Sequence, residues 1–131
     1  MEYFYCPKDN FKDFASGQVL YGGGGIPNFP IRLLIELYCR AKSYLPKSKD
    51  ITIYDPCCGG GYALTVLGFF HNHDIKKMYG SDINPNMVSH AKKNVALLTG
   101  IGIKKEKRKF SSYMTNTEKI HIKTRYIAVT D

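Results

Sequence analysis

The chain has 131 residues and a formal net charge of +8, and this length suits a single domain. Its hydrophobic fraction of 44% can supply a core, but no apolar run reaches the roughly 18 residues of a membrane-spanning helix. The first residues also lack the layout of a signal peptide. Because the four cysteines have no disulfide-like spacing, we expect a protein of the reducing cytoplasm.

Positive charge is concentrated near the end of the sequence. Residues 103–131 carry eight Lys or Arg side chains against three acidic ones. Such an excess favours an anionic macromolecular partner, most simply a nucleic acid. A solvated, charged surface without a partner is the alternative explanation.

Residues 1–27 are predicted to form an irregular N-terminal arm that precedes one domain over residues 28–131. The arm interleaves six aromatic side chains with lysines. Aromatic residues in this setting can stack on nucleic-acid bases, but more often they anchor a segment to the core.

Helices and strands are predicted to alternate through the rest of the chain. Asn28 with Pro30, and Asn84 with Pro85, are typical of helix starts. Strands that flank a connecting helix pair in parallel, so we expect an α/β, Rossmann-like fold with about three parallel strands and flanking helices. The expected elements are helix 31–41, strand 51–54, helix 62–71, strand 76–83, helix 85–98 and strand 120–131.

A glycine turn after the first strand carries the main functional signal. The strand ends in an acid, and three glycines lead into the next helix, as in the run Asp55, Pro56, Cys57, Cys58, Gly59, Gly60 and Gly61. Leu64 stands where a dinucleotide fingerprint has its third glycine, and no lysine follows as in a P-loop. The Asp55 carboxylate would repel a phosphate but suits an amino group and a sulfonium. This pattern predicts a site for S-adenosylmethionine.

Two further acids extend this predicted site. Asp82 ends the second strand, close to the spacing at which an acid accepts from both ribose hydroxyls. Asp131 ends the third and is placed to accept from the adenine amino group. The predicted cofactor-binding set is Asp55, Pro56, Cys57, Cys58, Gly59, Gly60, Gly61, Asp82, Ile83 and Asp131.

A metal site is the weaker alternative. Cys57 and Cys58 could be combined with His71 and His73, but adjacent cysteines do not suit one zinc ion and the usual Cys-x-x-Cys spacing is missing. We assign no metal ligand. Nor do we assign a catalytic acid or base, because the methyl group of a sulfonium is already activated and needs mainly positioning.

The motif resembles the avilamycin-resistance rRNA methyltransferase family, which reads Asp-Pro-Cys-Cys-Gly-Ser-Gly-Tyr where this chain has residues 55–62. Residues 29–33, 81–85 and 92–98 are also similar, and the resemblance covers roughly residues 18–100. It implies a class I methyltransferase fold and methyl transfer to a guanine in large-subunit ribosomal RNA. Gly60 replaces the serine of the family motif.

The resemblance also implies a seven-stranded sheet whose fourth strand ends in a Pro-Pro motif that holds the target base. The last proline of this chain is Pro85, so we expect only the N-terminal half of that fold, apparently truncated. A second chain could supply the missing strands. A catalytically inactive fragment that retains cofactor or RNA binding is the alternative function, and an unrelated nucleic-acid-binding module is a third.

Overall fold

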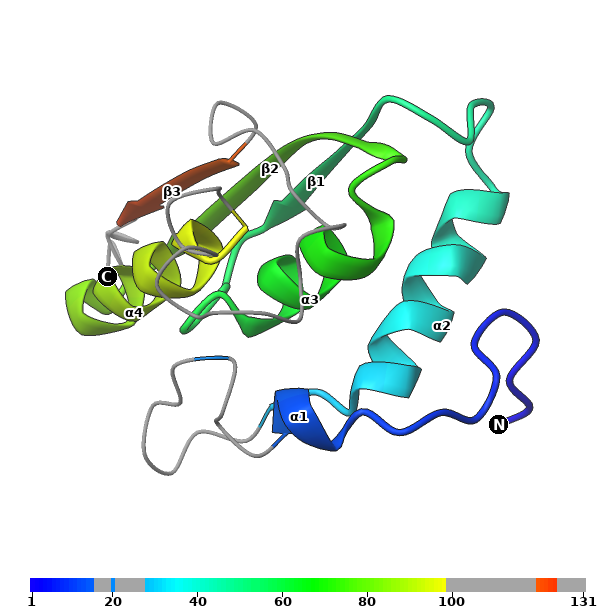
Figure 1. Ribbon diagram of the computed structural model, residues 1–131. Coiled ribbons are helices and arrows are strands. Elements are labelled where there is room, and N and C mark those ends of the chain that lie inside the picture. The colour runs from blue at the N-terminus through cyan, green and yellow to red at the C-terminus, as the bar shows by residue number, and fades with distance from the viewer. Residues whose placement is uncertain (16–19, 21–27, 99–119, 125–131) are drawn as a thin grey trace, which may run out of the picture.

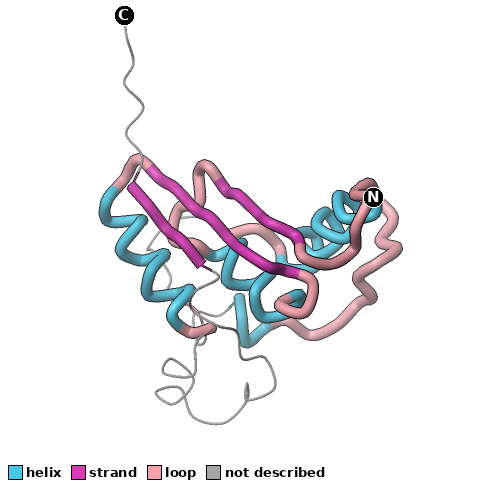
Figure 2. The backbone as a smooth tube through the Cα atoms, turned by 90° about the horizontal axis from the view of Figure 1, so that it is seen from above, coloured by secondary structure: helices cyan, strands magenta, loops and turns pink. Residues whose placement is uncertain are grey.

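Three parallel strands form the centre of the computed structural model, which describes residues 1–15, 20, 28–98 and 120–124. They lie in the order β1-β2-β3, and α3 and α4 lie together on one face of the sheet (Figures 1 and 2). The α/β architecture predicted from the sequence is confirmed. The elements are α1 (Lys12–Ala15), α2 (Ile31–Ser43), β1 (Ile51–Asp55), α3 (Tyr62–His71), β2 (Ile75–Asp82), α4 (Pro85–Ala96) and β3 (Ile120–Thr124).

The register between β1 and β2 places their carboxyl ends side by side. Tyr54 pairs with Tyr79, and Asp55 pairs with Gly80. In parallel strands both carboxyl ends meet at one edge of the sheet, where open α/β folds bind ligands. The residues that follow β1 and β2 therefore share one site.

The core lies between the sheet and its helices. Leu64 and Val66 of α3 are almost fully buried, as is Met78 on the facing side of β2. The buried side of α4 consists of Val88, Ala91, Val95 and, just beyond the helix, Leu98. Among the described residues, every helix is too short or too polar to cross a bilayer.

The N-terminal residues are anchored to this core. One helical turn, α1, lies inside the predicted arm. Phe14 is buried, with its ring 5.5 Å from that of Phe69 and 5.3 Å from that of Phe70. For Phe14 the structure therefore supports the anchoring interpretation. The boundary between arm and domain stays a prediction.

Two predicted details of the helix ends have different outcomes. Asn84 caps α4 by accepting from the backbone N–H of Asn86 at 2.9 Å, as expected. The prediction that Asn28 caps α2 is wrong, since the helix begins after Pro30 with no side-chain cap. Pro30 takes the position before the first helical residue, which leaves Asn28 too far away to serve.

The last predicted strand is described only in part. β3 pairs in parallel with β2 over Ile120–Thr124. Residues 125–131 of the predicted strand, Asp131 among them, lie outside the described residues.

Candidate cofactor site at the carboxyl ends of β1 and β2

The glycine turn depends on backbone conformations that only glycine adopts easily. Gly59 and Gly61 have φ angles of 51° and 71°. Gly61 also packs tightly against α4, because a Cβ at this position would lie 2.9 Å from the Cβ of Ala91. A Cβ at Gly59 would meet no atom within 4 Å, so a ligand can approach the backbone there.

Hydrogen bonds join the turn to the neighbouring elements. The backbone N–H of Cys58 donates to the carbonyl of Ser81 on β2 at 2.9 Å, and Gly61 donates to the Cys58 carbonyl at 2.8 Å. The Nδ2 of Asn94, buried in α4, donates to the Gly60 carbonyl at 2.8 Å. The turn is therefore fixed by both β2 and α4 rather than by its own sequence alone.

The two acids that follow β1 and β2 meet at this turn. Asp82 accepts from the backbone N–H of Gly59 through Oδ2 and from that of Asn84 through Oδ1, both at 2.9 Å. Asp55 accepts from the N–H of Cys57 at 3.1 Å. Both carboxylates are half-exposed. Each carboxylate offers about four acceptor positions, so both can also bind a ligand.

A cavity of about 390 Å³ opens beside the turn. That volume falls within the usual range for small-molecule sites. Of the predicted set, Asp55, Cys57, Cys58, Gly59 and Gly60 line it, whereas Pro56, Gly61, Asp82 and Ile83 lie outside its lining. Sequence reasoning missed its other wall, which comprises Asn28, Phe29, Leu34, Tyr62 and Ala63.

Cys58 of the turn does not provide a nucleophile. Cys58 is buried, and burial, followed by the charges of Asp55 and Asp82, raises the pKa of its thiol to about 11. A thiol with this pKa stays protonated near neutral pH, and the thiolate is the reactive form. Cys58 therefore serves packing and turn geometry.

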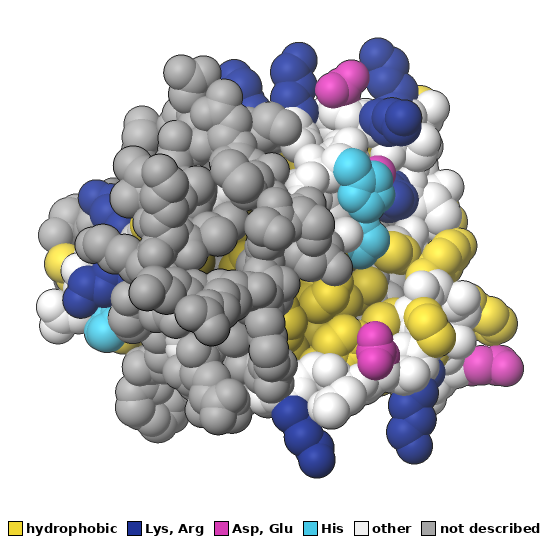
Figure 3. Space-filling view, in the orientation of Figure 1, with side chains coloured by type: hydrophobic (Ala, Val, Ile, Leu, Met, Phe, Trp, Pro, Cys, Tyr) yellow, Lys and Arg dark blue, Asp and Glu magenta, His cyan; other side chains and the backbone are white. Residues whose placement is uncertain are grey.

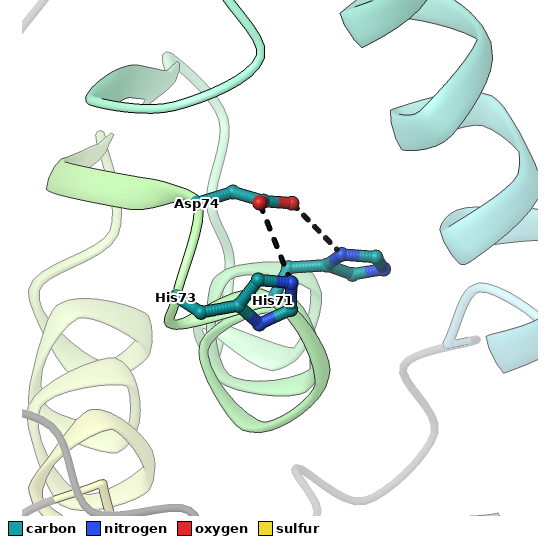
Figure 4. A group of neighbouring side chains, drawn as sticks. All are labelled: His71, His73 and Asp74. Atoms are coloured by element: carbon teal, nitrogen blue, oxygen red, sulfur yellow. Dashed lines mark hydrogen bonds and ion pairs between the residues drawn. The ribbon is translucent and has the colours of Figure 1, made fainter.

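A second group of titratable side chains lies away from the turn, at the start of β2 (Figure 4). Asp74, which is buried, has one carboxylate oxygen 3.3 Å from Nδ1 of His71 and the other 3.3 Å from Nε2 of His73. Lys42 also donates to Asp74 at 2.6 Å. The charge of Asp74 is thus already paired with a lysine, which argues against a cation there. Cys57 and Cys58, considered with these histidines in the sequence, belong to the glycine turn instead.

The parallel sheet, the glycine turn and the acids after two successive strands define the Rossmann-like methyltransferase class. The chain matches the family model described as rRNA methyltransferase AviRa over residues 1–130, and it belongs to that family. The family resemblance predicted from the motif is confirmed, and the match extends beyond residues 18–100.

Two kinds of relative support this assignment. The chain is 44% identical over 91 residues to the 23S rRNA (guanine(2535)-N(1))-methyltransferase of Streptomyces viridochromogenes, a match that covers 70% of this chain and 36% of that protein. Two solved structures of the rRNA methyltransferase aviRa from the same organism match with a TM-score of 0.72 and 40% identity. Each of these matches covers 76% of this chain and 40% of the solved chain. The matched parts thus cover well under half the length of these relatives.

Proposed function

We propose that the chain binds S-adenosylmethionine at the glycine turn. The observation that carries this proposal is the bond from the Gly59 N–H to Asp82, because it brings an acid of β2 to the glycine backbone that follows β1. Asp82 would accept from the ribose hydroxyls, and Asp55, which lines the cavity, would face the amino group. The open approach at Gly59 suits the amino-acid end of the cofactor.

We further propose that this site serves methyl transfer to a guanine of large-subunit ribosomal RNA in the cytoplasm. The curated relative is named for that reaction, and the net charge of +8 suits an RNA partner. Bound S-adenosylmethionine supplies the activated methyl group. The residues of this chain would hold the cofactor so that the sulfonium faces the acceptor.

The sheet also offers a place for a further strand. Within the described residues, β1 is hydrogen-bonded to a strand on one side only. An unpaired strand edge is a template for pairing. We propose that an added strand, supplied by a second chain, pairs with β1. Cofactor or RNA binding without methyl transfer is the second candidate function, because the chain spans 36% of its curated relative.

Isothermal titration with S-adenosylhomocysteine tests the cofactor site. Asp82→Asn keeps an oxygen for the Gly59 N–H but loses the charge. We expect its affinity to fall about tenfold or more, as a hydrogen bond to a charged group is worth roughly 1.5–3 kcal/mol. Asp50→Asn, the same change at an exposed acid just before the other end of β1, is the matched control. An unmodified chain that binds no S-adenosylhomocysteine refutes the site.

Transfer of a labelled methyl group to 23S rRNA tests the reaction. Labelling of a guanine by the chain supports methyltransferase activity. Cofactor binding without labelling supports the second function. Labelling that appears only when the remaining part of the curated relative is added would support the added strand.

A further inference from the structure

A second cavity lies next to the proposed cofactor site. It has a volume of about 610 Å³, and the two cavities share three lining residues, Asn28, Phe29 and Tyr62. The rest of its lining comes from the N-terminal segment and from the start of α2. A ligand in this cavity would lie against the same side chains as a bound cofactor.

Aromatic side chains give this cavity a surface for stacking. Phe11, Phe29 and Tyr62 line it, each from a different segment of the chain. Phe29 is 50% exposed, so much of its surface is open to a ligand. Stacking of a nucleic-acid base on an aromatic side chain contributes to binding whatever the base, since every base has a π-face.

Two cations stand in the same wall. Arg32 is held in place because its Nε donates to the Cys6 carbonyl at 2.9 Å and its guanidinium lies 3.9 Å from the ring centre of Tyr3. Lys12 is exposed on α1. Both line the cavity, so a phosphate there would be neutralised by two cations.

Pro30 and Ile31 add apolar surface to the lining, and the other three lining residues are polar and suit the edge of a base. Asp9 is a hydrogen-bond acceptor, and the amides of Asn10 and Asn28 offer both donors and acceptors. Figure 3 shows the wider setting: hydrophobic side chains gather on the face that α1, α2 and α3 form, with Lys and Arg side chains along its margins and acidic side chains beside them. The apolar surface suits a base, and Lys12 and Arg32 suit its phosphate.

We propose that this cavity binds a single unpaired nucleotide of the RNA, with its base on Phe29 and its phosphate between Lys12 and Arg32. The inference rests on the proposed function and deepens it, since it names the residues that present RNA to the cofactor. The two sites are adjacent because they share the wall of Asn28, Phe29 and Tyr62. Methyl transfer requires such adjacency, since a methyl group can pass only between ligands in contact.

Two variants separate the stacking and phosphate contacts. Phe29→Leu keeps an apolar side chain but removes the ring, and we expect RNA affinity to fall about tenfold. Lys12→Gln removes one charge, and we expect the slope of log affinity against log salt to fall by about 0.7 to 1. Lys77→Gln, the same change at an exposed lysine outside the cavity, is the matched control. Binding is measured by fluorescence anisotropy with a 23S rRNA fragment, and circular dichroism verifies folding.

Ultraviolet cross-linking followed by mass spectrometry gives an independent readout. We expect the cross-linked peptide to contain Phe11 or Phe29. If the Phe29→Leu and Lys12→Gln variants bind RNA as the Lys77→Gln control does, the inference is wrong, and it is also wrong if the unmodified chain binds no RNA. An unmodified chain that binds RNA through these residues but binds no S-adenosylhomocysteine would refute the cofactor site and uphold the nucleotide site.

Discussion

The glycine turn and the N-terminal segment of residues 1–15 both contribute to the adjoining cavities, but different forces hold them. The turn is fixed by backbone geometry and short hydrogen bonds, such as those from the N–H and Oγ1 of Thr65 to the Gly61 carbonyl at 3.0 and 2.7 Å. At the start of the chain, the backbone N–H groups of residues 4–6 donate to one side chain, Glu36, some thirty residues away. Backbone geometry is therefore decisive in the turn, whereas residues 4–6 depend on a buried charge.

Glu36 is fully buried in α2 and collects several donors. Its carboxylate accepts from the backbone N–H groups of Phe4 and Tyr5 at 2.8 Å and of Cys6 at 3.0 Å, and from Nε of Arg40 at 2.8 Å. Burial alone would raise the pKa of Glu36, but these hydrogen bonds outweigh burial and lower it to about 2. The position of the N-terminal segment thus depends on a charge that acid can remove.

The largest effect is expected at Gly61. Gly61→Ala forces a non-glycine residue into a left-handed conformation and places a Cβ 2.9 Å from that of Ala91. The conformation costs about 1–2 kcal/mol and the crowding about 1–3 kcal/mol, so we expect a loss of about 3 kcal/mol in the free energy of unfolding. Urea denaturation followed by circular dichroism measures it.

Gly59→Ala provides the control for the steric term. Gly59 has a similar φ angle, but a Cβ there would meet open space. We therefore expect Gly59→Ala to lower the free energy of unfolding by the conformational cost alone, about 1–2 kcal/mol. Equal losses at Gly59 and Gly61 would contradict the role of the close contact with Ala91.

Glu36→Gln should release the N-terminal segment while leaving the turn folded. We expect the backbone amides of Phe4, Tyr5 and Cys6 to exchange with deuterium about tenfold faster or more, whereas the amides of the turn keep their protection. Hydrogen exchange measured by mass spectrometry on peptides reports the two regions separately. Glu2→Gln, at an exposed acid of the same segment, should leave both unchanged.

The lowered pKa of Glu36 also predicts how acid affects the unmodified chain. The folded pKa of about 2 lies below the ordinary value of 4.5, so the stabilisation is fully present above about pH 4.5 and is lost as the pH falls towards 2. The amide protection of residues 4–6 should fall in this window in the unmodified chain but not in Glu36→Gln. Protection that is independent of pH in both proteins would rule out the anchoring by charge.

The turn could be predicted from the sequence because its determinants are local. An acid, three glycines and an apolar helix occur within a few residues, and the spacing to Asp82 follows from one helix and one strand. The cap at Asn84 is local in the same sense. The close approach of Ala91 to Gly61 was not predicted, because it depends on how α4 packs against the turn.

The hydrogen bonds that hold residues 4–6 could not be predicted, for the opposite reason. Helical periodicity predicts the helix over residues 31–41, but the structure also buries Glu36 in it, and the donors to Glu36 come from residues 4–6. A long-range contact between a carboxylate and backbone amides leaves no pattern in the sequence. The shared wall of the two cavities was missed because it joins Asn28 and Phe29, which precede α2, to Tyr62 at the start of α3, far away in the sequence.

The smallest effect is expected at Gly60, which lies between the two glycines that have positive φ angles. Unlike its neighbours it has no positive φ, and a Cβ there would lie 3.8 Å from Cβ of His90, an ordinary van der Waals distance. Gly60→Ser, which restores the serine of the resembled family motif, should therefore leave stability unchanged or raise it by up to about 1 kcal/mol, since it restricts the unfolded chain. Urea denaturation beside Gly61→Ala measures the contrast. A loss above about 1 kcal/mol would mean that the whole turn requires glycine, rather than only the two positions that its backbone geometry selects.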